Sequence, residues 1–230
     1  MSAQLPLGIQ LRDDATLDNF LFTPALAQLA SQLDRLVAGD GARMLFLHGA
    51  AGTGRSHLLQ AVCHGVGAGR ALYLPLEQLT ELCGSEVLAD IEQLELVCLD
   101  NVDSIAGRQE WEEALFHFYN RARDQQCRLL CSAAQAPRQL PLELADLRSR
   151  LGWELVFHLP GPTDEERLDI LRFRARRRGL ELSEDVARYV MTRAERGLPE
   201  LMGLLDRLDR DSLVQQRSLS IPFIKQSLGW

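Results

Sequence analysis

The chain has 230 residues, 46% of them hydrophobic, and a net charge of −7, which suits one α/β core plus a small accessory domain. No apolar run approaches the ~20 residues of a membrane span and the N-terminus lacks signal-peptide features, so we expect a cytoplasmic protein without membrane contact. Neither residues 1–160 nor residues 161–230 carry the basic excess of an autonomous DNA-binding domain. The five cysteines form no C-x-x-C pair, which favours reduced thiols over disulfides or a metal site.

Apolar strands and amphipathic helices alternate through the first two thirds of the chain. A helix is expected at about 24–37, a second after residue 55, and others at about 109–125 and 142–151. Strands are expected at 44–48, 70–74, 94–99, 128–132 and 154–158. This alternation, with strands that are apolar almost throughout, predicts a parallel five-stranded sheet flanked by helices on both faces.

The pattern changes at Pro160-Gly161-Pro162, after which only helical segments follow. Thr163-Asp164-Glu165-Glu166 has the form of a capping box, with a hydroxyl residue three positions before a glutamate. The helices are expected at about 163–178, 183–195, 199–216 and 221–228. We therefore predict a flexible leader at 1–12, an α/β domain at 13–160 and a small helical domain at 161–230.

The segment Gly49-Ala50-Ala51-Gly52-Thr53-Gly54-Arg55-Ser56 has the spacing of a phosphate-binding loop, G-x-x-x-x-G-K-[ST], with arginine in the lysine position. A predicted strand precedes it and a helix follows. Glycines let the backbone wrap an anion, and the N–H groups of the loop and of the helix N-terminus point toward it. Arg55 is a planar fork rather than the compact charge of lysine, so the loop predicts phosphate binding but weak hydrolysis.

Asp100 ends an apolar strand, the position from which P-loop proteins hold Mg²⁺ through water, and Ser56 offers a hydroxyl to the same ion. An aspartate at a strand end is also common in ordinary loops. Asn101 stands where hydrolytic relatives of such proteins have an acid, and its amide cannot take a proton from water. The two departures, Arg55 and Asn101, both indicate inefficient hydrolysis.

Two further groups of residues allow two interpretations each. Arg148 and Arg150 are either surface arginines or candidates for a cation supplied to a neighbouring subunit's triphosphate. The leader segment Gln4-Leu5-Pro6-Leu7 is either a tail or a short motif that docks in a partner's groove. The acidic side chains of Asp103, Glu110, Glu112 and Glu113 are most simply surface charges.

These motifs together resemble the AAA+ module of the DnaA family of replication initiators and, more closely, its Hda-like regulatory members. The resemblance lies in Thr16-Leu17-Asp18-Asn19-Phe20, the phosphate-binding loop with Gly54-Arg55-Ser56, Val97-Cys98-Leu99-Asp100-Asn101, Phe118-Tyr119-Asn120-Arg121, Pro137-Arg138-Gln139-Leu140, Ser149-Arg150-Leu151-Gly152-Trp153, Leu208-Asp209-Arg210 and Ile221-Pro222-Phe223-Ile224-Lys225. It covers essentially the whole chain, and the order and spacing of the motifs make it specific.

The resemblance implies a cytoplasmic negative regulator that binds ADP, docks on the DNA-loaded sliding clamp and promotes hydrolysis of ATP on DnaA. Gln4, Leu5, Pro6 and Leu7 become the clamp-docking residues, and Arg150 becomes the arginine finger acting in trans. The nucleotide-binding residues become Gly49, Gly52, Thr53, Gly54, Arg55, Ser56, His57, Asp100, Asn101 and Ser132, with Mg²⁺ at Ser56 and Asp100.

Two departures from the family pattern concern nucleotide sensing. The segment Ser132-Ala133-Ala134 lacks a frequent aspartate, so polar contact rests on Ser132. Pro199 aligns with the sensor arginine, and Arg196 lies one helical turn away. Other nucleoside diphosphates as ligands and a homo-oligomeric state stay open, as do two alternative functions: an autonomous NTPase of the helicase-loader type, and a clamp-bound scaffold that ignores nucleotide.

Overall fold

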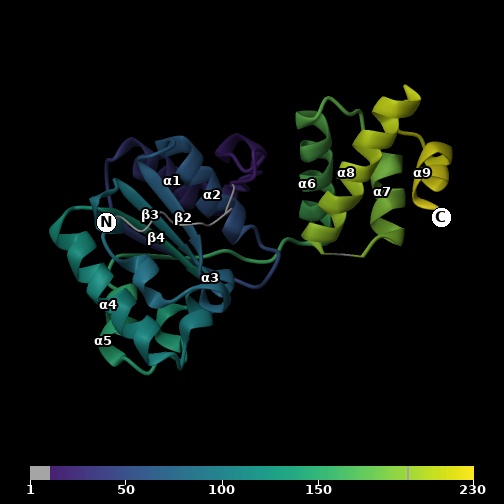
Figure 1. The fold of residues 1–230 in the computed structure, drawn as a ribbon. Helices are drawn as coiled ribbons and strands as arrows, with labels where there is room; N and C mark the ends of the chain where they lie inside the picture. Colours follow the sequence, from purple (N-terminus) through teal and green to yellow (C-terminus); the bar gives the residue numbers. More distant parts are fainter. Residues whose placement is uncertain (1–10, 196) are drawn as a thin grey trace. The chain divides into compact units, whose positions relative to one another are not determined.

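A computed structural model describes residues 11–195 and 197–230 of the chain. The chain divides into two compact units, one that ends at Pro160 and one that spans Gly161–Trp230 (Figure 1). The leader motif and Arg196 lie outside the described residues. Each unit has a hydrophobic core of its own.

The first unit is built on a parallel five-stranded sheet, as the alternation of strands and helices predicts. Its strands are β1 (Met44–His48), β2 (Ala71–Pro75), β3 (Leu96–Asp100), β4 (Arg128–Ala133) and β5 (Leu155–His158). Their order across the sheet is β2-β3-β4-β1-β5. Because β4 lies between β1 and β3, the segments that follow these three strands meet at one edge of the sheet.

Helices cover both faces of this sheet, which explains why most positions of the central strands are apolar. On β1, Leu45 and Leu47 face the core shared with α1 (Ala27–Ala38) and α2 (Arg55–Val66). Met44 and Phe46 face the opposite core, shared with α3 (Leu76–Leu82), α4 (Gln109–Asp124) and α5 (Ala145–Leu151). Figure 1 shows α1 and α2 on one side of the strands and α4 and α5 on the other.

Two details of the helices differ from the expectation. The short helix α3 follows β2 directly and was not predicted, since seven residues carry too little periodicity to mark it. Helix α5 begins at Ala145 rather than at 142, since the backbone of Leu144 is extended. The backbone N–H groups of Glu143 and Leu144 donate to the Glu112 carboxylate at 3.2 and 2.7 Å, a tertiary contact made by the loop before the helix.

The expectation that Glu112 is a surface charge is wrong. Its side chain, on α4, is 1% exposed and accepts three backbone N–H groups, the third from Gly107 at 2.9 Å. Buried carboxylates persist where hydrogen bonds satisfy them. Glu112 therefore ties the start of α4 to the loop before it and to the loop that leads into α5. Its neighbours Glu110 and Glu113 are exposed, as expected.

The second unit consists of α6 (Asp164–Arg177), α7 (Glu184–Arg193), α8 (Leu198–Gln215) and α9 (Ile221–Leu228). The predicted capping box is confirmed, since the Thr163 hydroxyl accepts from the Glu166 N–H while the Glu166 carboxylate accepts from the Thr163 N–H. Pro199 lies in the first turn of α8, where a missing N–H costs nothing. Leucines, Val190, Phe223 and Ile224 fill the core between the helices.

Candidate functional site

The loop between β1 and α2 has a backbone that glycine alone permits at several points. Gly52 and Gly54 have φ of 77° and 98°, in the left-handed region, and Gly54 caps the N-terminus of α2. A Cβ at Gly49 would lie 2.3 Å from the carbonyl oxygen of Leu159, and one at Gly54 would lie 2.7 Å from the Phe20 ring. The loop is therefore packed closely against Leu159, the residue after β5, and against the N-terminal segment, which restricts the positions of its N–H groups.

The side chains of Thr53 and His57 also pack against neighbouring segments, and neither lines the pocket described below. The Thr53 hydroxyl donates to the Ala50 carbonyl at 2.9 Å and is almost buried. The ring of His57, predicted to bind nucleotide, has its Nε2 2.9 Å from the Thr16 carbonyl oxygen and packs near Phe20. His57 can therefore serve a ligand only through its backbone, as part of the first turn of α2.

The Asp100 carboxylate lies at the end of β3 with 1% of the residue exposed. Two hydroxyl groups donate to it: that of Tyr73 on β2, at 2.6 Å, and that of Ser132 on β4. Burial first, and then the negative charge of Asp100, raises the pKa of Tyr73 well above its ordinary value. Tyr73 is therefore a permanent donor, and both oxygens of Asp100 are engaged.

Asn101 follows Asp100 with a φ of 55°, a left-handed conformation that asparagine tolerates better than most residues. Its backbone N–H donates to the Ser132 hydroxyl at 3.2 Å, and its side-chain amide donates to the Glu77 carboxylate at 3.1 Å. Ser132 thus links two consecutive residues at the strand end. The tertiary structure brings Asp100, Asn101 and Ser132 together, as the resemblance implies.

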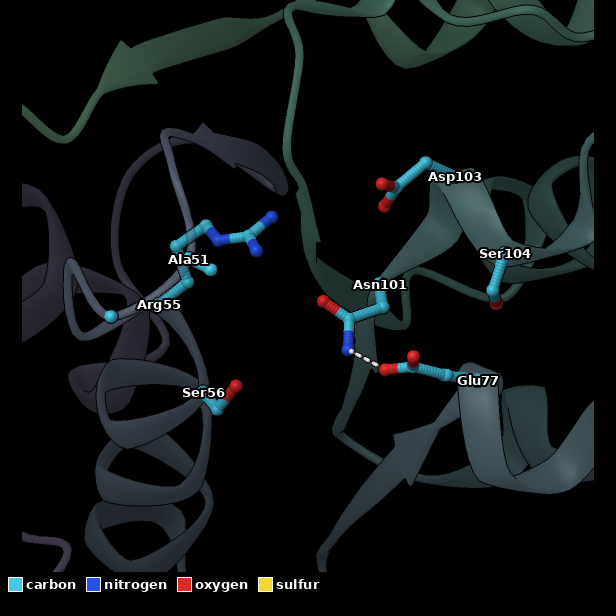
Figure 2. A pocket seen from close by; sticks show the side chains of 8 residues that line it. Ala51, Arg55, Ser56, Glu77, Asn101, Asp103 and Ser104 are labelled. Carbon is cyan, nitrogen blue, oxygen red and sulfur yellow. Dashed lines mark hydrogen bonds between the residues drawn. The ribbon is translucent and has the colours of Figure 1, made fainter. Parts of the chain in front are cut away.

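A pocket of about 440 Å³ opens beside the loop (Figure 2). Its walls are formed by Ala51, Gly52, Arg55, Ser56, Glu77, Asn101, Asp103 and Ser104. Figure 2 shows the Arg55 side chain reaching from the α2 side toward the opposite wall, where the Asp103 carboxylate faces it. Four predicted site residues, Gly52, Arg55, Ser56 and Asn101, line the pocket. The other six predicted residues do not line the pocket: Gly49, Thr53, Gly54, His57, Asp100 and Ser132.

Sequence reasoning missed four residues of this region. Glu77 lies on α3, an element that the sequence pattern did not reveal, and Tyr73 lies on the predicted strand β2. Asp103 and Ser104, on the short 3₁₀ helix Val102–Ile105, were taken for surface residues or passed over. The available signal was their position two to three residues after Asn101, since the ends of parallel strands converge at one edge of the sheet.

Arg150 lies elsewhere, on α5, in a setting of neutral groups. Its guanidinium donates to the Asn120 amide oxygen at 2.6 Å. Its central carbon lies 4.7 Å from the centroid of the Phe116 ring and 5.1 Å from that of the Trp153 ring. Among the described residues, no carboxylate pairs with it. The charge is thus positioned by stacking and one hydrogen bond, but it is not neutralised.

The imidazole rings of His48 and His158 stack at the ends of β1 and β5, 4.9 Å apart, beside the loop. Burial, followed by the charge of His158, lowers the pKa of His48 below 6.5. At a given pH near neutrality, His48 is therefore protonated to a greater extent in the unfolded chain than in the folded chain. The free energy of unfolding is expected to decrease as the pH falls from about 7 through the lowered pKa.

This prediction is checked by urea unfolding of wild type and His48→Gln at a series of pH values between about 7.5 and 5. The variant should show a shallower loss of stability on acidification. An identical pH profile in both proteins would show that His48 contributes nothing to the pH dependence.

A parallel sheet with β1 between β4 and β5, a phosphate-binding loop after β1 and an aspartate at the end of β3 together define a P-loop AAA+ module, here followed by a helical lid. The family comparison agrees. Residues 11–158 match the bacterial DnaA ATPase domain and residues 164–228 match the lid domain of Hda. The chain belongs to the DnaA family of AAA+ proteins, and its lid is of the kind specific to Hda.

Solved structures show the same fold at low identity. Domain III of the DnaA replication initiation protein of Thermotoga maritima superposes with a TM-score of 0.78 and 23% identity, over 96% of this chain and 98% of that one. AMPPCP-bound DnaA from Aquifex aeolicus gives 0.71 and 21%, over 89% and 72% of the two chains. The RuvB Holliday junction branch migration motor of Thermotoga maritima gives 0.68 and 18%, over 94% and 71%.

No helix in the described parts of the chain combines the length and the apolar character that a membrane crossing requires.

Proposed function

We propose that this DnaA-related regulator of replication initiation binds ADP in the pocket beside the β1–α2 loop, docks on the DNA-loaded sliding clamp through Gln4, Leu5, Pro6 and Leu7, and presents Arg150 to ATP held by DnaA. In this proposal the chain acts as a regulator with weak or no ATPase activity of its own. The setting of Arg150 is the observation that carries the proposal.

Arg150 has the properties required of a cation that acts on another protein's nucleotide. Transfer of the γ-phosphoryl group spreads negative charge over its oxygens, and an arginine supplied in trans is worth about 10³ to 10⁵ in rate. Such a cation must be oriented before the partner arrives and must not be neutralised by its own chain. Asn120 and the Phe116 and Trp153 rings orient Arg150, and no described carboxylate pairs with it.

The pocket favours holding a nucleotide over hydrolysing one. The loop offers backbone N–H groups, and Arg55 adds a fixed positive charge next to the expected position of the phosphates. Asn101 stands in the position for an acid, and its amide is engaged by Glu77. Structures of DnaA with AMPPCP support a nucleotide at this place in the fold. ADP, or another nucleoside diphosphate, is the ligand that we propose.

A magnesium ion is implied by the fold family, and the pocket contains oxygen atoms suited to it. Ser56 presents a hydroxyl group on the pocket wall, and the carboxylate of Asp100 stands at the end of β3, next to the pocket residue Asn101. Among the described residues, no three histidine, cysteine or acidic side chains gather into a metal site, so phosphate oxygens and water would complete the shell. When bound, the ion would neutralise phosphate charge.

The clamp interaction is tested by replacing Gln4. In an assay of ATP hydrolysis on DnaA with clamp-loaded DNA, Gln4→Ala is expected to lose most of the stimulation, because the clamp no longer raises the local concentration of the regulator. The measurement is phosphate release from DnaA-bound ATP.

Gln10→Ala, a glutamine a few residues further along the leader, is the matched control and should retain activity. Full stimulation by Gln4→Ala would remove clamp docking from the proposal. Turnover by the chain alone, lost in Ser56→Ala, would instead support an autonomous NTPase, and ADP-independent melting would support a scaffold that ignores nucleotide.

A further inference from the structure

Trp153 follows α5 and contacts the Arg150 side chain, yet it lies outside the cores of its unit. The residue is 57% exposed and belongs to neither hydrophobic core of the first unit. Its ring centroid lies 5.1 Å from the central carbon of the Arg150 guanidinium, within the range of a cation–ring contact. Its indole N–H donates to the Ser149 hydroxyl at 3.3 Å. These contacts tie the ring to the end of α5 that carries Arg150.

A tight turn after α5 places the indole beside Arg150. The Gly152 N–H donates to the Ser149 carbonyl and the Trp153 N–H to the Arg150 carbonyl, both at 3.1 Å. These two bonds span three residues each, so they continue the helix as a narrower turn. Residues three apart on such a turn share a face. The backbone that bonds Trp153 to Arg150 therefore also sets the ring against the guanidinium.

The other contacts of the Arg150 guanidinium come from a single helix, α4. Asn120 accepts a hydrogen bond at 2.6 Å, and the Phe116 and Tyr119 ring centroids lie at 4.7 and 5.9 Å. A guanidinium at the end of a long side chain has several rotatable bonds, so contacts with one helix leave it some freedom. Trp153 adds a contact from a different element and reduces that freedom.

We propose that Trp153 is a positioning residue for the arginine finger, and that its ring holds the Arg150 guanidinium in the orientation required by the phosphate of the partner's ATP. The inference rests on the proposed function and gives Trp153 an effect on rate rather than on affinity. A cation oriented in advance stabilises the transition state without reorganisation at the moment of reaction. Without the ring, the guanidinium spends part of its time in other orientations, and the rate falls accordingly.

The experiment is single-turnover hydrolysis of ATP on DnaA with clamp-loaded DNA, measured over a range of concentrations of the full chain. It gives a maximal rate and a half-saturating concentration. Trp153→Ala is expected to lower the maximal rate about three- to tenfold, the effect of losing one cation–ring contact. The half-saturating concentration should stay close to that of wild type. Urea unfolding checks that the variant is folded, as expected for a residue outside the cores.

Two conservative variants separate the ring from its bulk and from its N–H group. Trp153→Phe keeps an aromatic face but loses the donor to Ser149, so it should recover most of the maximal rate. Trp153→Leu keeps apolar bulk without an aromatic face, so it should resemble Trp153→Ala. Equal rates in these two variants would contradict the role of the ring.

A double variant tests whether Trp153 acts through Arg150. In the Arg150→Ala background, Trp153→Ala should cause no further loss, because the group that it orients is already absent. A further loss would show that the indole acts independently of Arg150. A raised half-saturating concentration with an unchanged maximal rate would make Trp153 a binding contact for DnaA, and either result would overturn the inference.

Val156→Ala is the matched control, because Val156 is another exposed apolar side chain, 38% exposed and three residues further along the chain. It should keep the wild-type maximal rate. A wild-type maximal rate in Trp153→Ala, together with an inactive Arg150→Ala, would overturn this inference and leave the finger standing. Undiminished stimulation by Arg150→Ala would overturn both.

Discussion

Replacing Arg150 with alanine is expected to reduce stimulation of ATP hydrolysis on DnaA by about 1,000-fold or more, the lower bound for loss of an arginine finger. The physical reason is the loss of a cation that meets the negative charge developing in the transition state. The affinity for DnaA should change far less, because the guanidinium group of Arg150 acts on the reacting phosphate. The measurement is single-turnover hydrolysis of ATP on DnaA with clamp-loaded DNA.

Two variants separate this role from a structural one. Arg148→Ala removes a charge from the same helix, but Arg148 donates to the Leu142 carbonyl at 3.1 Å, so stimulation should be largely retained. Arg150→Lys keeps the charge and loses the fork that stacks on Phe116 and reaches Asn120, so it should restore only part of the activity. Undiminished stimulation by a folded Arg150→Ala variant would overturn the proposed finger.

Replacing Glu112 with alanine is expected to lower the free energy of unfolding by about 3 to 5 kcal/mol. Three backbone N–H groups, those of Gly107, Glu143 and Leu144, would lose their acceptor at once, and each hydrogen bond to a charged group contributes about 1.5 to 3 kcal/mol. Denaturant unfolding of the two proteins measures the difference. Because Glu143 and Leu144 lead into α5, stimulation by Arg150 should fall as well.

The matched control is Glu113→Ala, at the adjacent position of α4. Its carboxylate is exposed and accepts only from the Gln109 side chain, so stability should change by no more than about 0.5 kcal/mol. Glu112→Gln, which keeps one acceptor oxygen and places an NH₂ group toward a donor, should lie between. Equal stability of Glu112→Ala and wild type would show that water replaces the carboxylate.

Local pattern predicted much of this molecule. The parallel sheet follows from runs such as residues 96–99, which are apolar at every position because both faces are covered. The capping box of Thr163 and Glu166 acts over three residues, so it is legible in the sequence. The glycines of the loop after β1 could also be interpreted from the sequence, since the left-handed backbone at Gly52 and Gly54 strongly favours glycine.

Contacts between distant residues were decided only by the fold. Nothing near Glu112 in the sequence shows that Gly107, Glu143 and Leu144 will bring their N–H groups to it, so it read as a surface charge. The same holds for Tyr73 and Ser132, whose hydroxyls meet Asp100 because β2 and β4 flank β3.

The phosphate-binding loop, the departures at Arg55 and Asn101, and the order of strands and helices are properties of the sequence by itself. The tertiary structure decided which polar groups are already satisfied. It brought the hydroxyls of Tyr73 and Ser132 to the carboxylate of Asp100, from strands that are far from β3 in the sequence. The physical reason is that hydrogen-bond satisfaction depends on residues far apart in the chain, whereas periodicity and glycine conformation depend on neighbours.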